Sequence, residues 1–290
     1  MRVLVTGAGG MLAQAVLPAL AAADHVVVPF TRAALDVTRA ADVRRAVREA
    51  RPDWVCHLAA TTDVDGCERE PERAFLVNGL GARNVAAAAE EAGAAVLAVS
   101  TDYVFAGDDP APRREHDPVG PLSVYGRSKL AGEEAVRALN PRHTIVRTAW
   151  LYGQGGRNFV DTIRARVQDG AGPGGPTPLR VVDDQHGAPT WTADLADVLV
   201  ALMVRREFGT LHATNDGACT WHELACEICR QAGVSVTVER STSAELARPA
   251  RRPAHSVLHT GWLEHVLGRR LPHWRDALTR YLAQAVAARV

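Results

Sequence analysis

The chain has 290 residues, of which 47% are hydrophobic and 23% charged, and 33 lysines and arginines balance 33 aspartates and glutamates. This composition is typical of a globular protein with one large domain or two fused lobes, and the neutral balance argues against nucleic acid or an anionic membrane as the main partner. We expect a cytoplasmic protein with reduced thiols, because the chain has no signal-peptide layout, no apolar run near the roughly 20 residues of a membrane helix, and an odd number of cysteines.

The first residues predict a strand, a glycine turn and a helix. Residues 2–6 form a short β-branched run, GAGGMLA follows at 7–13, and an alanine- and leucine-rich helix extends to about residue 22. Gly7 and Gly10 would let the backbone approach a pyrophosphate, which the N–H groups and positive dipole end of the helix would face. A plain tight turn is the alternative, but the position directly after the first strand favours dinucleotide binding.

The end of the second predicted strand bears on the choice of cofactor. Residues 25–30 are rich in valine, which predicts a strand buried on both faces, and the strand ends at Thr31-Arg32. An acidic residue near this point suits the ribose 2′-hydroxyl of NAD, whereas an arginine suits a 2′-phosphate. Arg32 therefore favours NADPH, with NADH as the other cofactor and a solvated loop arginine as the other interpretation.

Strands and helices then continue to alternate. Residues 40–50 predict a helix with Thr38 as its N-cap, and 72–92 predict a longer helix that contains Asn78. Strands are expected at 53–58, 94–100 and 143–148. The third strand runs into small residues at 59–61, and the fourth delivers a Ser-Thr-Asp-Tyr run at 100–103 to the edge of the sheet where open α/β folds place their sites. This alternation predicts a Rossmann-type, doubly wound parallel sheet.

A tyrosine and a lysine four residues apart lie in the helix predicted from Tyr125 to about residue 138. Residues spaced i and i+4 share a helical face, with Cβ atoms about 5–6 Å apart. An ammonium at that distance favours the phenolate, so we expect Lys129 to lower the pKa of Tyr125 towards working pH. The pair is then a candidate for general acid–base chemistry, although the same spacing also occurs by chance on solvated helices.

The alternation breaks after Trp150. Flexible loops are expected at 153–156 and 170–178, a strand at 179–182, and helices at 192–204, 220–232 and 271–287. We therefore expect residues 1–150 to form the dinucleotide-binding domain, with segments near 179–204 returning to it. Residues 151–290 would mainly form a smaller substrate-binding lobe over the carboxyl edge of the sheet.

Several long motifs resemble those of one enzyme family, the dTDP-4-dehydrorhamnose reductases of the extended short-chain dehydrogenase/reductase superfamily. The motifs are STDYVF at 100–105, PLSVYGRSKLAGE at 121–133, RTAWLYG at 147–153, VDDQHGAPT at 182–190, Arg252-Pro253 with Ser256-Val257-Leu258, and LPHWR at 271–275. The resemblance covers nearly the whole chain. It implies NADPH-dependent reduction of the C4 ketone of dTDP-4-dehydro-L-rhamnose to dTDP-L-rhamnose.

The resemblance also implies a role for individual residues. Tyr125 would protonate the sugar O4 as hydride arrives, Lys129 would tune Tyr125 and hold the nicotinamide ribose, and Thr101 would bind the carbonyl. The remaining cofactor positions are Gly7, Gly10, Met11, Leu12, Arg32, Asp36, Val37, Ala59, Ala60, Thr61 and Asn78. The substrate candidates are Thr101, Asp102, Tyr103, Trp150, Asn158, Gln185, His186 and Arg252, and for Trp150 a core position between the lobes is the alternative.

Three further expectations follow from the resemblance. Some relatives hold magnesium through a carboxylate early in the first helix, but here Gln14 occupies that region, so no tightly bound metal is expected. A homodimer is the family expectation. The loop at 170–178 departs from the usual connection and leaves the identity of the sugar open.

Two clusters admit both a functional and a structural interpretation. Cys219, His222, Cys226 and Cys229 have spacings compatible with zinc, and two of them form a Cys-x-x-Cys pair, but a packing face along one helix explains them better. Arg248, Arg251 and Arg252 could meet a nucleotide pyrophosphate or lie in a solvated turn.

Two alternative functions remain at this stage. The chain could reduce a different dTDP-4-keto-6-deoxy sugar of secondary metabolism, or it could be a non-catalytic, nucleotide-binding regulatory subunit of the same fold. The intact set of Thr101, Tyr125 and Lys129 favours an enzyme.

Overall fold

The computed structural model describes residues 1–169 and 178–287. The glycine- and proline-rich loop expected at 170–178 lies outside the described residues, apart from Pro178. Within the described part, no helix is both long and apolar enough to cross a membrane.

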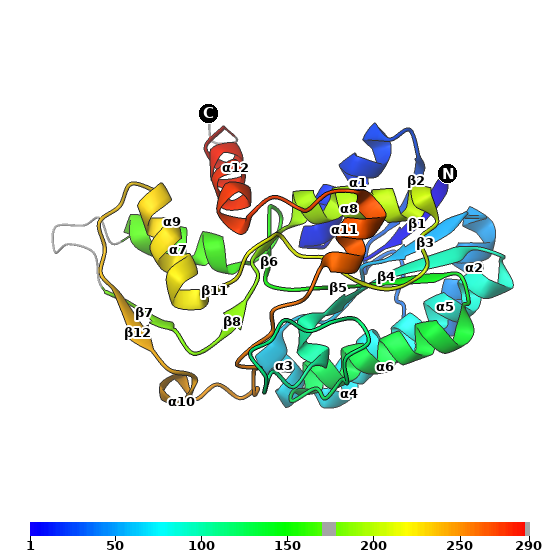
Figure 1. Ribbon diagram of the computed structural model, residues 1–290. Helices are drawn as coiled ribbons and strands as arrows, with labels where there is room; N and C mark the ends of the chain where they lie inside the picture. The colour runs from blue at the N-terminus through cyan, green and yellow to red at the C-terminus, as the bar shows by residue number, and fades with distance from the viewer. Residues whose placement is uncertain (170–177, 288–290) are drawn as a thin grey trace.

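The centre of the structure is a six-stranded parallel sheet in the order β10-β5-β4-β3-β1-β2, which confirms the predicted doubly wound fold (Figure 1). The chain passes from β1 to β2 on one side and then returns to β3 on the other side of β1. Ligands of open α/β sheets bind at such a switch point, outside the carboxyl ends of the strands. The strands are β1 (Arg2–Thr6), β2 (Val26–Phe30), β3 (Trp54–His57), β4 (Ala95–Thr101), β5 (His143–Thr148) and β10 (Gly209–His212).

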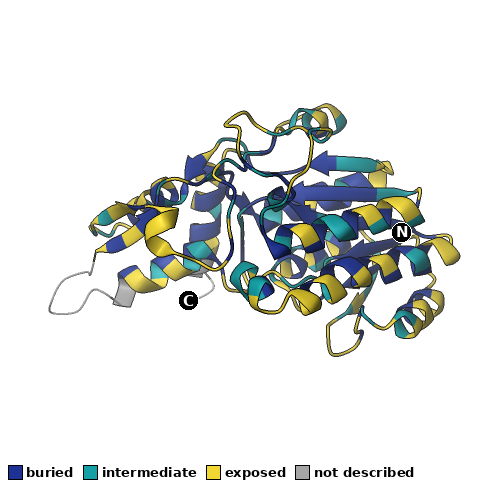
Figure 2. Cartoon of the chain, turned by 90° about the horizontal axis from the view of Figure 1, so that it is seen from below, coloured by how far each residue is buried: buried dark blue, intermediate teal, exposed yellow. Residues whose placement is uncertain are grey.

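Helices cover both faces of this sheet. On one face α1 (Met11–Ala22), α8 (Thr192–Arg205) and α11 (Gly261–Leu267) enclose a core that includes Val3, Leu97 and Leu199. On the other face α2 (Ala40–Ala50), α5 (Ala82–Glu91) and α6 (Val124–Leu139) enclose a second core. Figure 2 shows the consequence: most of the sheet is buried, while the helices turn exposed residues outwards.

A second, smaller region lies beyond the carboxyl end of the sheet (Figure 1). Its core packs α7 (Phe159–Asp169), α9 (Trp221–Gln231) and α12 (Trp274–Ala287) against short strand pairs. The parallel pairs are β6 (Leu151–Tyr152) with β9 (Thr190–Trp191) and β7 (Leu179–Val182) with β12 (Val238–Ser241), and the antiparallel pair is β8 (His186–Gly187) with β11 (Cys219–Thr220). The short helix α10 (Ser243–Leu246) follows β12.

The segments expected to return to the first region do so only in part. Helix α8 packs on the central sheet beside α1, and its Leu195 and Leu199 belong to the same core as Val3. Strand β7 does not join the six-stranded sheet, because it pairs with β12 in the second region.

Two local predictions were wrong. Strand β2 is not buried on both faces, since it is the edge strand of the sheet and Val26 is exposed. Thr38 does not cap α2; the N-cap is Arg39, and Thr38 instead donates its amide and hydroxyl to Asp36.

The long helix expected at 72–92 is present, but it is not α-helical throughout. After α3 (Val64–Arg69), the chain is continuously helical from Pro71 to Glu91, as a short α4 (Pro71–Ala74), a π-helical segment η1 (Phe75–Gly81) and then α5. Periodicity in the sequence does not distinguish a π turn from an α turn over so few residues.

The candidate zinc and redox cluster lies on and beside α9. All five cysteines are free; Cys219 and Cys229 are buried in the core of the second region, whereas Cys226 is exposed. His222 faces the Val238 carbonyl, with its Nε2 at 3.1 Å. Among the described residues, no group of three or more His, Cys, Asp or Glu side chains could hold a metal ion.

Candidate active site

The glycine turn forms a close backbone crossing at the switch point between β1 and β3. Gly7 has a φ of +69°, and a Cβ at this position would lie 2.6 Å from the Ala59 amide nitrogen. Only glycine satisfies both constraints. The Gly10 amide donates to the Gly7 carbonyl (2.9 Å), and Gly10 is the N-cap of α1 without a side-chain cap. The first amides of α1 therefore face outwards from the turn, as phosphate binding requires.

Side chains next to this turn are divided between the site and the core. Met11 begins α1 beside Gly156, where a Cβ would approach the Met11 Cβ to 2.8 Å. Leu12 is buried in the sheet core, so only its backbone can serve a ligand. The side chain of Arg32 is exposed just after β2 and has no ion-pair partner among the described residues.

The loop after β2 is shaped by Asp36 and Val37. Hydrogen bonds from the Thr38 hydroxyl and amide lower the pKa of Asp36. The Val37 carbonyl accepts from Asn84 Nδ2 (3.0 Å), and the Val37 side chain lies where a Cβ on Gly81 would be. These contacts attach the loop to η1 and α5.

A hydrogen-bond chain joins the exit of β3 to the helix of the tyrosine. Asn78, on η1, accepts from the Thr61 amide (2.8 Å) and donates to the Thr61 carbonyl (3.1 Å) and to Ser128 Oγ (2.9 Å). Ser128 in turn donates to the Tyr125 carbonyl (2.8 Å). The half-buried Ala59 and Ala60 lie within the segment that Asn78 holds. Ser128 was not identified as a site residue from the sequence, and its place inside Tyr-x-x-x-Lys is the signal that could have indicated it.

Helix α6 begins at a well-defined point and packs closely against its neighbours. Ser123 caps it by accepting from the Gly126 amide (3.1 Å). A Cβ on Gly126 would lie 2.3 Å from the Tyr103 carbonyl oxygen, so glycine allows the helix to approach η2 (Asp102–Val104). As a result the rings of Tyr103 and Tyr125 meet edge to face, with centroids 5.8 Å apart.

Burial dominates the protonation of the tyrosine and lysine. It lowers the pKa of the Lys129 ammonium to about 8, an effect that Glu133 opposes, and Lys129 Nζ donates to the Val99 carbonyl (2.7 Å). Burial also raises the pKa of Tyr125, while the Thr101 side chain acts in the opposite direction. The pKa of Tyr125 is therefore raised in the ligand-free protein, against the expectation that Lys129 brings it down, because desolvation of the phenolate is the largest effect on it. Tyr125 therefore retains its proton.

Thr101 ends β4 and Asp102 begins η2, next to this pair. The Thr101 hydroxyl donates to Asp102 Oδ1 (2.9 Å), and Thr101 Oγ accepts from the Tyr103 amide (3.2 Å). Burial raises the pKa of Asp102 to about 6, although hydrogen bonding from Ser256 and Thr101 lowers it. Burial likewise raises the pKa of Tyr103.

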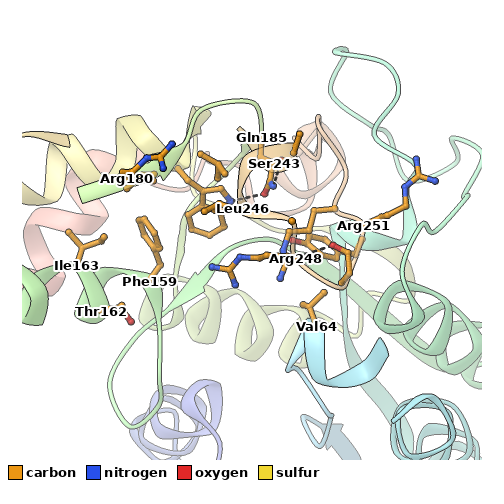
Figure 3. A pocket seen from close by; sticks show the side chains of 18 of the residues that line it. Val64, Phe159, Thr162, Ile163, Arg180, Gln185, Ser243, Leu246, Arg248 and Arg251 are labelled. Carbon is orange, nitrogen blue, oxygen red and sulfur yellow. Dashed lines mark hydrogen bonds between the residues drawn. The ribbon is translucent and has the colours of Figure 1, made fainter. Parts of the chain in front are cut away.

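A pocket of about 610 Å³ is lined by Tyr103 and by residues of the second region, several of which Figure 3 shows. It is lined by apolar side chains such as Phe159 and Leu246 and by a group of arginines. Figure 3 shows Arg248 near Val64, where the second region meets α3. The arginines are Arg166, Arg180, Arg248, Arg251 and Arg252.

Two stacked tryptophans form one wall of this part of the site. The rings of Trp150 and Trp221 are parallel to within 7°, with centroids 3.5 Å apart, and Trp221 Nε1 donates to Gln185 Oε1 (3.2 Å). Trp150 has a φ of +47°, and a Cβ on Gly187 would overlap its indole. Trp150 packs between elements and supports Trp221, which lines the pocket, whereas a role of Trp150 in substrate binding stays a prediction. No motif in the sequence indicated Trp221.

Five predicted substrate residues do not line this pocket, namely Thr101, Asp102, Trp150, Asn158 and His186. Asn158 donates to the Gly153 carbonyl (2.9 Å) and to Asp161 (2.8 Å), and so organises the start of α7. His186 stacks on His255 with centroids 4.9 Å apart, and its amide donates to the Ala254 carbonyl. Tyr103, Gln185 and Arg252 do line it.

The arginines near Tyr103 are held by a carboxylate from the first region. Asp65, on α3, accepts from Arg252 through both oxygens (3.1 and 3.0 Å), from Arg248 (3.3 Å) and from the Ala250 amide (3.2 Å). Burial raises the pKa of Asp65, but these hydrogen bonds outweigh it and hold the pKa below its ordinary value. No pattern in the sequence indicates Asp65, because the contact spans more than 180 residues.

A second cavity, of about 250 Å³, lies between α1, α8 and α12, away from this site. Gln14, the residue expected where relatives carry a metal-binding carboxylate, lines it together with Gln154, Gln284 and Asp197.

Comparison with known proteins agrees with this geometry. Residues 1–287 match the family described as RmlD substrate binding domain. The chain is 48% identical to the dTDP-4-dehydrorhamnose reductase of Streptomyces griseus, over 96% of this chain and 92% of the relative. It is 42% identical to a probable dTDP-4,6-dihydroxy-2-methyloxan-3-one 4-ketoreductase of Streptomyces antibioticus, over 99% and 97%.

A solved structure supports the same assignment. The dTDP-4-dehydrorhamnose reductase of Bacillus anthracis, in complex with NADP, superposes with a TM-score of 0.93 at 37% identity and covers 98% of this chain and 99% of that one. With the glycine turn and Thr101 at the carboxyl edge of the sheet, and Tyr125 packed on Tyr103 beside the arginine-lined pocket, the chain belongs to the dTDP-4-dehydrorhamnose reductase family of extended short-chain dehydrogenase/reductases.

Proposed function

We propose that this protein reduces the C4 ketone of dTDP-4-dehydro-L-rhamnose with NADPH, giving dTDP-L-rhamnose. The observation that carries the proposal is the position of Thr101 and of the helix with Tyr125 and Lys129 at the carboxyl edge of the sheet, where the Tyr125 ring packs on Tyr103, a residue that lines the arginine-rich pocket. A diphosphate-linked sugar would place its charged groups among the arginines and its ketone near the tyrosine.

The crowding at Gly7 and the uncapped start of α1 fit a dinucleotide pyrophosphate. When bound, the nicotinamide supplies the hydride. Asn78 would hold the β3 exit loop against the cofactor through Thr61, and Lys129 would hold its ribose. Arg32 would pair with a 2′-phosphate, which supports NADPH over NADH.

The chain's own residues supply the proton. Tyr125 keeps its proton in the buried site and gives it to the sugar O4 as negative charge develops there. Lys129, with a pKa of about 8, is mostly protonated at neutral pH, so its charge stabilises the phenolate that remains. Thr101 would bind the carbonyl oxygen and orient the ketone.

The test is turnover with a panel of dTDP-4-keto sugars and either NADPH or NADH, followed by loss of nicotinamide absorbance. We expect dTDP-4-dehydro-L-rhamnose to be the best substrate and NADPH the better cofactor. Replacing Arg32 by alanine should reduce the preference for NADPH without abolishing turnover with NADH. An Arg32→Ala variant with an unchanged cofactor ratio would remove Arg32 from the cofactor site.

A second candidate is reduction of another dTDP-4-keto-6-deoxy sugar. The 42% identity to a probable 4-ketoreductase of a different dTDP sugar favours this alternative. Good turnover of another sugar beside none of the rhamnose precursor would establish it. A protein inert with every sugar would instead indicate a regulatory subunit. We also propose, from the family alone, a homodimer, which light scattering on the purified protein would test.

A further inference from the structure

Asp102 is a buried carboxylate for which reduction of a ketone requires no direct role. It follows Thr101 in the chain and is 2% exposed. Its Oδ1 accepts the Thr101 hydroxyl at 2.9 Å, while its buried Oδ2 has no hydrogen bond of standard geometry among the described residues, and the Ser256 hydroxyl, although near enough to lower the pKa of Asp102, donates to the His186 carbonyl. A buried carboxylate with so few donors disfavours the charged form of the group.

The hydrogen bonds of Thr101 conflict with its assignment as a carbonyl donor. A threonine hydroxyl has one proton and two acceptor positions. Thr101 Oγ accepts from the Tyr103 amide and donates its single proton to Asp102. While Asp102 is ionised and holds that proton in a hydrogen bond, Thr101 has none to offer a substrate oxygen.

We propose that Asp102 is a positioning residue that reverses the Thr101 hydroxyl: in the reactive state Asp102 is protonated, donates from Oδ1 to Thr101 Oγ, and thereby directs the Thr101 proton to the sugar ketone. This inference rests on the proposed function. In the reversed arrangement Thr101 accepts from Asp102 and from the Tyr103 amide and donates to the substrate, so its full hydrogen-bonding capacity is satisfied. The proton on Asp102 is not consumed and no bond to it breaks during the reaction.

The surroundings of Asp102 favour the protonated form. The titratable groups next to it are Tyr103 and Tyr125; a tyrosine is neutral or anionic, and burial raises the pKa of both, so neither supplies a charge that would favour the carboxylate. Arg252 acts on Tyr103 and is paired with Asp65. The loop that carries Ser256 also carries His255, which stacks on His186.

Two further features bear on the same equilibrium. The Ser256 hydroxyl donates to the His186 carbonyl (3.3 Å), although hydrogen bonding from it would stabilise the ionised Asp102. Burial outweighs that effect and raises the pKa of Asp102 to about 6. Both protonation states are therefore accessible near neutral pH, with the reactive one favoured as the pH falls.

The kinetic test compares the pH dependence of kcat in the wild type, Asp102→Asn, Thr101→Val and the double variant. In the wild type kcat should fall as the pH rises through the Asp102 pKa, approaching about tenfold per pH unit. The asparagine amide does not titrate and can donate to Thr101 permanently, so Asp102→Asn should lose this fall. Thr101→Ser should keep it, and Thr101→Val should lose it.

Three kinetic outcomes would overturn the inference. One is a wild-type profile without this fall, and another is an Asp102→Asn variant that retains the fall. The third is a Thr101→Val variant in which Asp102→Asn still alters the profile, because Asp102 would then act without Thr101. A wild type that turns over no keto sugar contradicts the proposed function instead.

A measurement that needs no turnover distinguishes a failure of this inference from a failure of the proposed function. The carboxyl carbon of Asp102 can be followed by NMR in the ligand-free wild type and assigned by its loss in Asp102→Asn. We expect a titration midpoint well above the ordinary value of about 3.9. A midpoint at or below that value would overturn the inference, whatever the activity.

Discussion

The cleft has two ends that are built in different ways. At the inner end, Thr101 and Lys129 are buried, and they are fixed by the last residues of β4 and the first turns of α6. At the outer end, Arg248 and Arg252 come from a loop after α10 and are held by Asp65 across the junction of the two regions. The end of a strand and the start of a helix therefore fix the residues of the inner end. The arginines of the outer end are held by ion pairs, which a ligand could replace.

This difference separates the two tasks of the cleft. Under the proposed function, desolvation at the inner end would control protonation and thereby how fast a bound ketone reacts. Guanidinium groups at the outer end are already arranged around one anionic group, a carboxylate, and so are suited to another. Substitutions at the inner end should therefore change kcat, and substitutions at the outer end should change KM.

Tyr125→Phe gives the largest expected effect. Removing the phenolic proton donor should lower kcat by about 10²- to 10⁴-fold with little change in KM, because the ring and its contact with Tyr103 remain. Steady-state kinetics with NADPH and the best keto sugar measure both constants, and circular dichroism checks the fold. An undiminished kcat would remove Tyr125 from the chemistry.

Arg252→Ala should act mainly on KM. Loss of a bidentate, charge-assisted donor should raise the KM of the dTDP sugar by about 10- to 100-fold while kcat changes much less. Arg252→Lys is the matched control, since it keeps the charge but loses the planar fork, and it should fall in between. If kcat collapsed while KM stayed constant, the division of the cleft into two ends would be wrong.

Asp65→Asn tests the junction itself. The folded-state pKa of Asp65 is lowered, so the stabilisation from its ionised form is present above the unfolded pKa and is lost as the pH falls through the folded value. Below about pH 4 the wild type should therefore lose more stability than Asp65→Asn. Each kcal/mol of unfolding free energy that is lost should lower Tm by about 2–4 °C. Thermal melts over pH 3 to 7 measure this, and parallel curves would show that the ion pairs contribute no net stability.

The smallest effect should come from metal removal. Gln14 supplies an amide rather than a carboxylate to the cavity between α1, α8 and α12, and amides bind divalent cations more weakly. We expect dialysis against EDTA, and later addition of magnesium, to leave kcat, KM and Tm unchanged. Activity that required magnesium would contradict this.

What could be predicted from the sequence also differs between features built from neighbouring residues and features built from distant ones. The glycine turn and the strand-four Ser-Thr run were predictable because each is set by residues adjacent in the chain. The ion pairs of Asp65 and the Trp150–Trp221 stack were not, because each joins segments that only the folded chain brings together.

The sequence was also a poor guide to protonation. Tyr125 and Lys129 share a helical face as the spacing predicted, yet their pKa values are governed by burial, a property of the whole fold. The exposure of β2 was missed for a similar reason, since an edge strand and a central strand can have the same valine-rich sequence.

The π-helical segment η1 makes this part of the chain sensitive to insertions and deletions. A π turn contains more residues than an α turn, so deleting one residue from Phe75–Gly81 would let the helix adopt the commoner geometry. The same deletion would rotate the helix before or after it by about 100° and take Asn78 away from Thr61 and Ser128. Substitutions within this segment should thus be tolerated more readily than insertions or deletions.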